Sequence, residues 1–240
     1  MIDPRTLAES GILLVDKPET WTSHDVVNCI RRRFKVAKVG HCGTLDPNAT
    51  GLLVIVLGRA TKLAGRLSGQ DKVYSGTMCL GVETSTQDRE GTVTATREVG
   101  PLTPERIEEE AAHFRGDIQQ IPPMVSAVKK DGRPLYKLAR KGIEIEREPR
   151  PVCISELTFT GYELPFVHFR VVCSKGTYVR TLCADLGTRL GCGAHLHALR
   201  RLASGRFSVD GAVTIDSIKT WEREQLLANM IPLTRVLAYL

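Results

Sequence analysis

One carboxylate in this 240-residue chain, that of Asp46, has sequence neighbours that suggest a functional acid. Asp46 belongs to the stretch Gly40-His41-Cys42-Gly43-Thr44-Leu45-Asp46-Pro47-Asn48-Ala49-Thr50-Gly51, and an apolar run from Leu52 to Leu57 follows. Glycine permits backbone angles closed to other residues, whereas proline fixes its own φ and disfavours a helical residue before it. We therefore expect a tight loop that holds Asp46 extended in front of a buried strand. Asp46 is either a functional acid or an Asp that only caps its own turn.

Composition predicts a globular protein with a substantial core. The length suits one large domain or two small ones, and the apolar and charged contents are ordinary. No apolar run approaches the roughly 20 residues that span a bilayer, and the N-terminus lacks a signal-peptide pattern. We therefore expect a cytoplasmic protein without a membrane partner. The net charge of +6 suits a polyanionic partner, but it also suits an ordinary basic protein.

The cysteines show no pattern of a disulfide framework. They are seven in number, scattered, and without CxxC pairs. In a cytosolic setting we expect them to be reduced thiols, many of them buried. The group Cys183, Cys192, His195 and His197 is a weak zinc candidate, so we expect no metal site.

Periodicity predicts strands and helices in irregular order. Strands are expected over residues 11–18, 52–57, 72–80, 92–99, 151–160 and 166–173. Helices are expected over residues 25–34, 104–114, 179–190, 214–218 and 221–230, with a short one starting at 61. Because strands and helices do not alternate as βαβ units, the sequence predicts an α+β fold with a mixed or mostly antiparallel central sheet flanked by helices.

The segment from Pro122 to Arg150 differs from its surroundings. From Met124 to Arg150 it holds eight basic and four acidic residues, a net charge of +4, and its apolar residues are sparse. We expect it to leave the core as a basic, thumb-like insertion. The alternative is an ordinary solvated charged loop.

Four motifs follow one another along the chain. They are Lys17-Pro18 after an apolar strand, the loop Gly40–Gly51, Lys72-Val73-Tyr74, and the stretch from Ser174 to Leu182. Together they resemble the motifs of the TruB-type pseudouridine synthases, the bacterial tRNA pseudouridine-55 synthases. The segments 122–127 and 193–201 also match that family, so the resemblance covers nearly the whole chain.

This resemblance implies the pseudouridine synthase fold and an isomerase. Its catalytic domain would span residues 1–230, with the basic insertion at 122–150 and a short tail at 231–240. Many family members carry a C-terminal PUA RNA-binding domain, and we expect none here because the chain ends at Leu240. The expected partner is the T-arm stem-loop of tRNA, and the expected state is a monomer.

The implied reaction converts uridine at position 55, in the T-loop of tRNA, to pseudouridine. The glycosidic C1′–N1 bond breaks, the uracil rotates, and a C1′–C5 bond forms. No metal or other cofactor is needed, because the substrate is isomerised without net oxidation or hydrolysis.

The resemblance assigns three catalytic residues. Asp46 would be the nucleophile, since a carboxylate can capture or stabilise an anomeric carbon that loses its base. Arg180 would pair with Asp46 and keep it ionised, unless it is a solvated helix arginine. Tyr74 would stack on the uracil, a contact worth roughly 1–3 kcal/mol, unless it is only a core tyrosine.

The remaining expected site residues bind the substrate. His41 would help to flip or hold the extruded nucleotide, because a stacked uridine must leave its loop before it reacts. Lys17 would support the region of Tyr74, Leu199 would pack near the base, and Tyr178 would also contact the substrate. The basic insertion would close on the tRNA through Lys129, Lys130, Arg133, Lys137, Arg140 and Lys141.

Two other functions remain open at this point. One is a catalytically silent RNA-binding protein or tRNA chaperone on the same fold. The other is a nucleoside hydrolase or base glycosylase, because a carboxylate at C1′ also suits hydrolysis.

Overall fold

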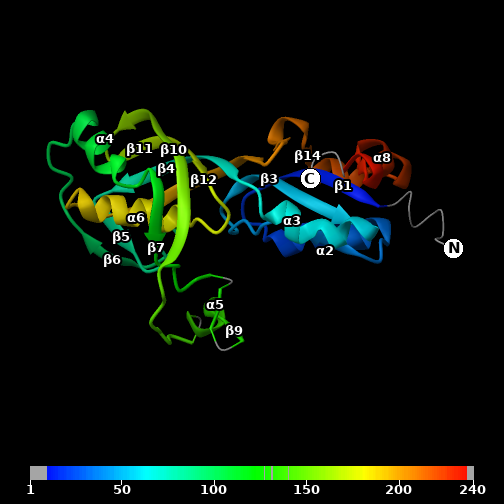
Figure 1. Cartoon of the computed structure of the whole chain (residues 1–240), viewed down its shortest axis with the longest axis horizontal. Helices are drawn as coiled ribbons and strands as arrows, with labels where there is room; N and C mark the ends of the chain where they lie inside the picture. Colours follow the sequence, from blue (N-terminus) through cyan, green and yellow to red (C-terminus); the bar gives the residue numbers. More distant parts are fainter. Residues whose placement is uncertain (1–9, 127, 131, 140, 237–240) are drawn as a thin grey trace. The chain divides into compact units, whose positions relative to one another are not determined.

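The computed structural model describes residues 10–126, 128–130, 132–139 and 141–236, which form two compact units. The first unit comprises Met1–Tyr74 and Leu199–Leu240, and the second comprises Ser75–Ala198 (Figure 1). Arg140, one of the basic residues expected to bind RNA, lies outside the described residues.

The first unit is built on a mixed sheet in the order β14-β1-β3-β12. These strands are β14 (Val213–Thr214), β1 (Gly11–Lys17), β3 (Thr50–Leu57) and β12 (Ala194–Ser204). β1 runs antiparallel to β3, and β12 runs parallel to it, with Arg200 opposite Thr50. Three short strands extend the pairing: β2 (Val39–His41) on β3, β13 (Phe207–Ser208) on β12, and β15 (Ile231–Pro232) on β1.

Strand β3 is the centre of the first unit's core. Its side chains from Leu52 to Leu57 are all buried, which explains why the sequence shows a continuous apolar run instead of alternation. Leu52, Val54 and Val56 pack in one cluster with Ala60 and Leu67. A buried strand of this kind fixes the backbone of the loop that precedes it, which carries Asp46.

The helices of the first unit are short. They are α2 (Ser23–Phe34), the 3₁₀ helix η1 (Gly58–Leu63), α3 (Ala64–Ser68), the 3₁₀ helix η2 (Val209–Gly211), α7 (Ile215–Thr220), α8 (Arg223–Asn229) and α9 (Leu233–Val236). α2 begins with a capping box, in which the Thr22 and Asp25 side chains each accept a hydrogen bond from the other residue's main chain. The three arginines in its last turn suit the negative end of the helix dipole.

The second unit holds strands in the order β4-β11-β10-β7. They are β4 (Lys72–Leu80), β11 (Phe166–Cys173), β10 (Arg150–Glu163) and β7 (Gly116–Gln120), and β10 is antiparallel to both of its neighbours. A separate hairpin pairs β5 (Val82–Thr84) with β6 (Val93–Thr96). The helices α4 (Pro104–Ala112) and α6 (Val179–Arg189) complete this unit, and α4 packs against both β10 and α6.

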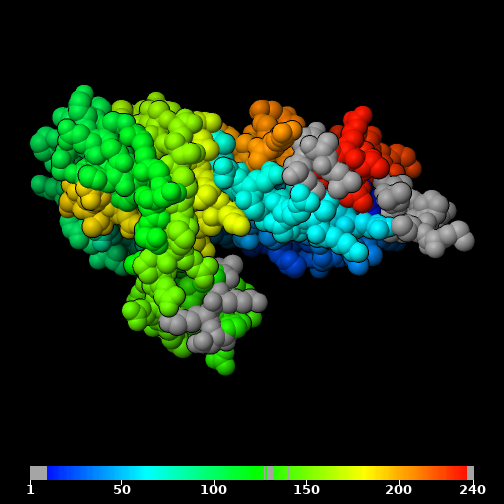
Figure 2. All heavy atoms as spheres, viewed as in Figure 1, coloured from blue at the N-terminus to red at the C-terminus, as the bar shows by residue number. Residues whose placement is uncertain are grey.

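The basic segment between β7 and β10 forms a small lobe of its own. It contains β8 (Lys129–Lys130), β9 (Arg133–Pro134) and α5 (Leu135–Ala139). Leu135 is buried in it, and Arg147 Nη1 donates to Pro122 O at 3.4 Å, which ties the two ends of the segment together. Figure 2 shows the lobe protruding from the rest of its unit, so the expected excursion from the core is confirmed.

The predicted α+β class with a mixed sheet is confirmed. The strands expected near residues 11–18, 52–57, 72–80 and 166–173 lie where the sequence placed them, but β7 and β12 were not expected as strands. None of the helices in the described part of the chain is long and apolar enough to cross a membrane.

Candidate active site

The loop that carries Asp46 joins β2 to β3 and is anchored beside the carboxylate. Leu45 is buried, and Ser23 Oγ bonds both of its main-chain groups: it accepts from the Leu45 amide at 2.9 Å and donates to its carbonyl at 3.2 Å. After Asp46 the chain turns, because the Ala49 amide donates to Asp46 O at 3.1 Å. The half-buried Asp46 side chain is therefore carried by a backbone that is fixed on both sides.

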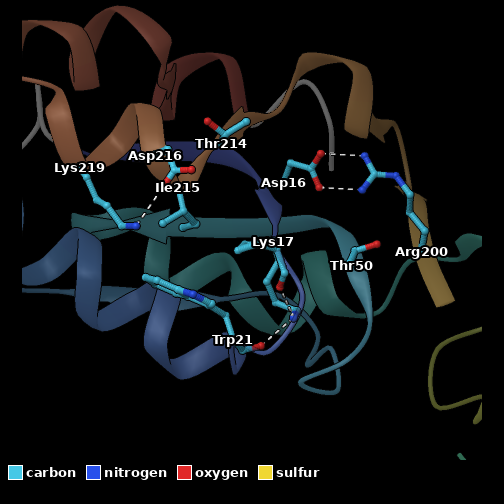
Figure 3. A pocket seen from close by; sticks show the side chains of 10 residues that line it. Asp16, Lys17, Trp21, Thr50, Arg200, Thr214, Ile215, Asp216 and Lys219 are labelled. Carbon is cyan, nitrogen blue, oxygen red and sulfur yellow. Dashed lines mark hydrogen bonds and ion pairs between the residues drawn. The ribbon is translucent and has the colours of Figure 1, made fainter. Parts of the chain in front are cut away.

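Lys17 joins the end of β1 to this loop. Its side chain is fully buried, and Nζ donates to the carbonyls of Trp21 (2.6 Å), Pro18 (2.9 Å) and Pro47 (2.9 Å). Figure 3 shows the Lys17 side chain turned toward Trp21. An ammonium group has three donors, and here three main-chain carbonyls accept them. The contact with Pro47 places this cation beside the residue that follows Asp46.

The pKa of Lys17 reflects this burial. Desolvation lowers it from 10.5 to about 8, while the negative charge of Asp46 acts in the opposite direction and raises it. At neutral pH Lys17 is therefore still mostly protonated, and it interacts electrostatically with Asp46. The expected role of Lys17 beside Tyr74 stays a prediction, whereas its place beside the Asp46 loop is a finding.

Two neighbouring arginines of β12 have different surroundings. Arg200 is half-exposed and forms a bidentate ion pair with Asp16 at 2.7 and 2.9 Å, at the wall of a pocket of about 420 Å³ (Figure 3). Arg201 is only 1% exposed. Its Nε donates to Leu52 O at 2.6 Å, and its Nη2 donates to Gly43 O at 3.2 Å. Both arginines lie in the segment 193–201, but neither was expected as a site residue.

His41 lies at the start of the loop and is half-buried. Desolvation lowers its pKa, and the nearby charge of Arg201 lowers it further, so the neutral imidazole is favoured near pH 7. Its Nδ1 is buried, and among the described residues it has no hydrogen-bond partner.

Tyr74, on β4, is 9% exposed, and Leu199, on β12, is half-buried. The first unit thus contains Lys17, His41, Asp46, Tyr74 and Leu199.

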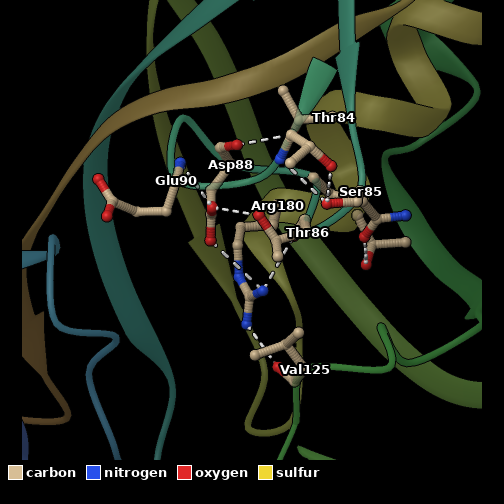
Figure 4. Close-up of polar contacts among 10 residues, drawn as sticks. Thr84, Ser85, Thr86, Asp88, Glu90, Val125 and Arg180 are labelled. Atoms are coloured by element: carbon tan, nitrogen blue, oxygen red, sulfur yellow. Dashed lines mark hydrogen bonds and ion pairs between the residues drawn. The ribbon is translucent and has the colours of Figure 1, made fainter. Parts of the chain in front are cut away.

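Arg180 belongs to the second unit, on the first turn of α6. It is 3% exposed, which excludes the alternative of a solvated helix arginine. Nη1 donates to Thr86 O at 3.0 Å, Nη2 donates to Val125 O at 2.9 Å, and Nη1 lies 3.5 Å from Asp88 Oδ2 (Figure 4). Arg180 therefore ties α6 to the polar loop after β5 and to the base of the basic lobe.

Asp88 is the residue of this network that sequence reasoning missed. Its Oδ1 accepts hydrogen bonds from Thr86 Oγ1 (2.5 Å) and the Glu90 amide (3.1 Å), while its carbonyl accepts from Thr84 Oγ1 (2.6 Å) (Figure 4). These bonds hold Oδ2 toward Arg180. A signal was present, since four of the five residues from Thr84 to Asp88 are Ser, Thr or Asp, whose side chains can bond the main chain of a turn. The sequence could not show which of them faces the arginine.

Asp46 and Arg180 lie in different units, so their expected ion pair stays a prediction.

Tyr178 caps α6 through its main chain: its amide donates to Gln120 Oε1 at 2.7 Å, and its carbonyl accepts from Gln120 Nε2 at 3.0 Å. Among the expected RNA-binding residues of the lobe, Arg133, Lys137 and Lys141 are exposed. Lys129 and Lys130 form β8 by their main chains.

The described residues contain no group of three or more His, Cys, Asp or Glu side chains that could hold a metal ion. All seven cysteines are free thiols, and burial raises the pKa of several of them, including Cys42 to about 11. The groups that the structure places at the loop are the Asp46 carboxylate, the buried Lys17 ammonium that interacts with it, and the His41 imidazole at its start.

The chain matches two related family models over most of its length. Residues 31–179 match the N-terminal domain of the TruB family pseudouridylate synthases, and residues 180–238 match the C-terminal domain of tRNA pseudouridylate synthase B. It is 50% identical to the tRNA pseudouridine synthase B of Opitutus terrae over 232 residues, which cover 97% of this chain and 96% of that protein. The corresponding protein of Syntrophotalea carbinolica is 50% identical over 224 residues, or 92% and 73% of the two chains.

Solved structures show the same fold. A chain in the crystal structure of a Cbf5-Nop10-Gar1 complex is 28% identical and superposes with a TM-score of 0.76, covering 100% of this chain and 65% of that one. A chain of an H/ACA RNP bound to a substrate RNA containing 2′-deoxyuridine is 26% identical, with a TM-score of 0.72, over 98% and 63% of the two chains. The present chain thus spans slightly less than two thirds of these solved chains.

The place of Lys17 beside Asp46 gives a testable electrostatic prediction. An NMR titration of the Lys17 side chain should give a pKa of about 8, and Asp46→Asn should lower it further, because the carboxylate charge stabilises the protonated amine. Lys17→Arg identifies the resonance. A Lys17 pKa that does not move in Asp46→Asn would show that the two groups do not interact.

Proposed function

This chain belongs to the TruB family of pseudouridylate synthases, and we propose that it converts uridine to pseudouridine at position 55, in the T-loop of tRNA, with Asp46 as the nucleophile. The activity class follows from the family and from relatives that are half identical over nearly the whole chain. The residue roles and the choice of the T-arm are our proposal.

The anchored Asp46 loop is the observation that carries the nucleophile assignment. The Ser23 hydroxyl bonds the main chain of Leu45, the Ala49 amide donates to Asp46 O, and Lys17 donates to the carbonyl of Pro47. A catalytic group that is held in place loses little freedom in the transition state, which is a large share of what enzymes contribute to rate. An Asp that only capped its turn would not account for a buried cation beside it.

The chemistry follows from the position of this carboxylate. Asp46 attacks C1′ of the flipped nucleotide, and the electrons of the C1′–N1 bond leave with the uracil. The uracil rotates, and its C5 attacks C1′, which releases the carboxylate. The proton on C5 then leaves, and N1 gains a proton. Atoms balance, since the product is an isomer of the substrate.

The surrounding groups serve this step in different ways. A buried tyrosine, Tyr74, offers an aromatic face for the uracil, as bases stack well on such rings. His41 is uncharged near neutral pH and lies at the start of the loop, where it would hold the flipped nucleotide. Arg180, kept rigid by Asp88 and two carbonyls, would supply the counter-charge for Asp46.

Replacing Asp46 tests the proposal directly. Asp46→Asn keeps the size of the side chain and removes its nucleophilic charge, so pseudouridine formation on a T-arm stem-loop should fall by at least about 10,000-fold. Binding of the same RNA should change by no more than about threefold. Pseudouridine content is measured by mass spectrometry of the digested RNA, and binding by filter retention.

The controls separate the competing functions. Equal pseudouridine content with wild type and Asp46→Asn would contradict the catalytic role and favour a silent RNA-binding protein. Release of free uracil would indicate a hydrolase or glycosylase. Equal conversion of a stem-loop with a scrambled loop sequence would contradict the T-loop specificity.

The exposed basic lobe should contribute to RNA affinity by charge. In the double variant Lys137→Gln and Lys141→Gln, affinity for the T-arm should fall at low salt, and the slope of log affinity against log salt should become shallower by about 1–2. Arg170→Gln, on the exposed face of β11 in the same unit, is the matched control. An unchanged salt slope in the double variant would remove the lobe from the RNA contact.

A further inference from the structure

Arg201 is one of the largest fully buried side chains among the described residues, and it bonds the main chain on both sides of Asp46, at Gly43 and at Leu52. We infer that Arg201 is a positioning residue that fixes the Asp46 carboxylate for attack by bridging the main-chain carbonyls of Gly43, in the loop before Asp46, and Leu52, in β3 after it. This inference rests on the proposed function, because it needs Asp46 to act.

The bridge is made by two arms of one planar group. Nε donates to the carbonyl of Leu52, the third residue of β3, and Nη2 donates to the carbonyl of Gly43, two residues after the end of β2. Asp46 lies between them, three residues after Gly43 and six before Leu52. A guanidinium presents its donors in a fixed fork, so the two carbonyls are held at a defined separation.

The main chain of Arg201 also shapes the loop. Arg201 lies opposite Gly51 in the parallel pairing of β12 and β3. Gly51 has a φ of +97°, and a Cβ there would lie 2.3 Å from Arg201 O, so only glycine allows this approach. Gly43, with a φ of +91°, would bring a Cβ to 3.4 Å from Arg201 Nη1. The contact at Gly43 is an ordinary one, so of these two glycines Gly51 is the one that the close approach of Arg201 requires.

A lysine at position 201 could not make both of these hydrogen bonds. An ammonium group is compact and ends in a single nitrogen, whereas the guanidinium spans Leu52 O and Gly43 O at once. In Arg201→Lys at least one of these buried carbonyls would lose its donor, and that end of the loop would be free to move. The charge would remain, so the variant separates geometry from electrostatics.

An electrostatic signature accompanies the bridge. Burial is the largest cause that lowers the pKa of His41, and the charge of Arg201 comes next. The main chain of Gly43 raises this pKa, and the charge of His24 lowers it slightly. Arg201→Gln should therefore raise the pKa of His41, as an NMR titration would show. Arg200→Gln, which alters the neighbouring arginine paired with Asp16, should leave that pKa unchanged.

The deciding experiment compares Arg201→Lys with Arg200→Lys in the intact protein. Single-turnover pseudouridine formation on a T-arm stem-loop should fall by about 100-fold in Arg201→Lys, as expected when a catalytic group is displaced by a fraction of a bond length. RNA binding should stay within about threefold of wild type, and Arg200→Lys should keep the rate within the same factor. A loss confined to the rate, with binding kept, is the mark of a positioning residue.

Each other outcome counts against the inference. A full rate in Arg201→Lys, or equal losses in the two lysine variants, would overturn it, and so would an unmoved His41 pKa in Arg201→Gln. Should these variants not fold, the wild type still decides, because rapid solvent exchange of the Arg201 Nε proton would contradict a buried bond to Leu52. Asp46→Asn is measured in parallel. If Asp46→Asn stays active, the proposed function is wrong. If Asp46→Asn is inactive and Arg201→Lys is fully active, the proposed function stands and only the role of Arg201 is wrong.

Discussion

The Asp46 loop depends on buried cations that bond main-chain carbonyls. Lys17 and Arg201 are both almost inaccessible to water, and between them they hold the carbonyls of Gly43, Pro47 and Leu52. Removing such charges from water is costly, and it is tolerated only where hydrogen bonds replace the lost hydration. The hydrogen bonds of these two cations therefore hold the loop that carries Asp46 in one conformation.

Much of the fold and part of the site could be predicted from the sequence. The run from Leu52 to Leu57 is a strand buried on both faces, and Asp46 stands in the loop before it. Strand β7 was missed because Gly-Asp-Ile-Gln-Gln is short and polar, and β12 because charged residues interrupt its alternation. In that strand Arg200 and Arg201 look alike as a basic pair. Adjacent side chains of a strand point to opposite faces of the sheet. The structure therefore shows Arg200 in a half-exposed ion pair and Arg201 buried between two carbonyls, a difference that the sequence does not reveal.

The second unit shows the same limit of sequence reasoning. Sequence reasoning assigned Arg180 one expected partner, Asp46, and none of the partners that the structure shows. Its partners come from segments about 55 and 92 residues away, at Val125 and Asp88, and are brought together only by tertiary structure. The exposed basic residues of the lobe, in contrast, follow directly from composition, since a charged segment with few apolar residues cannot bury itself.

We propose that catalysis depends on where the loop holds the Asp46 carboxylate as well as on its charge. Asp46→Glu tests it most directly, since glutamate keeps the charge and moves the carboxylate by one methylene. The measurement is the single-turnover rate of pseudouridine formation on a T-arm stem-loop, with RNA binding measured alongside. We predict a fall of about 100-fold or more in rate with binding nearly unchanged. A rate within about threefold of wild type would show that charge alone suffices, and would contradict the account.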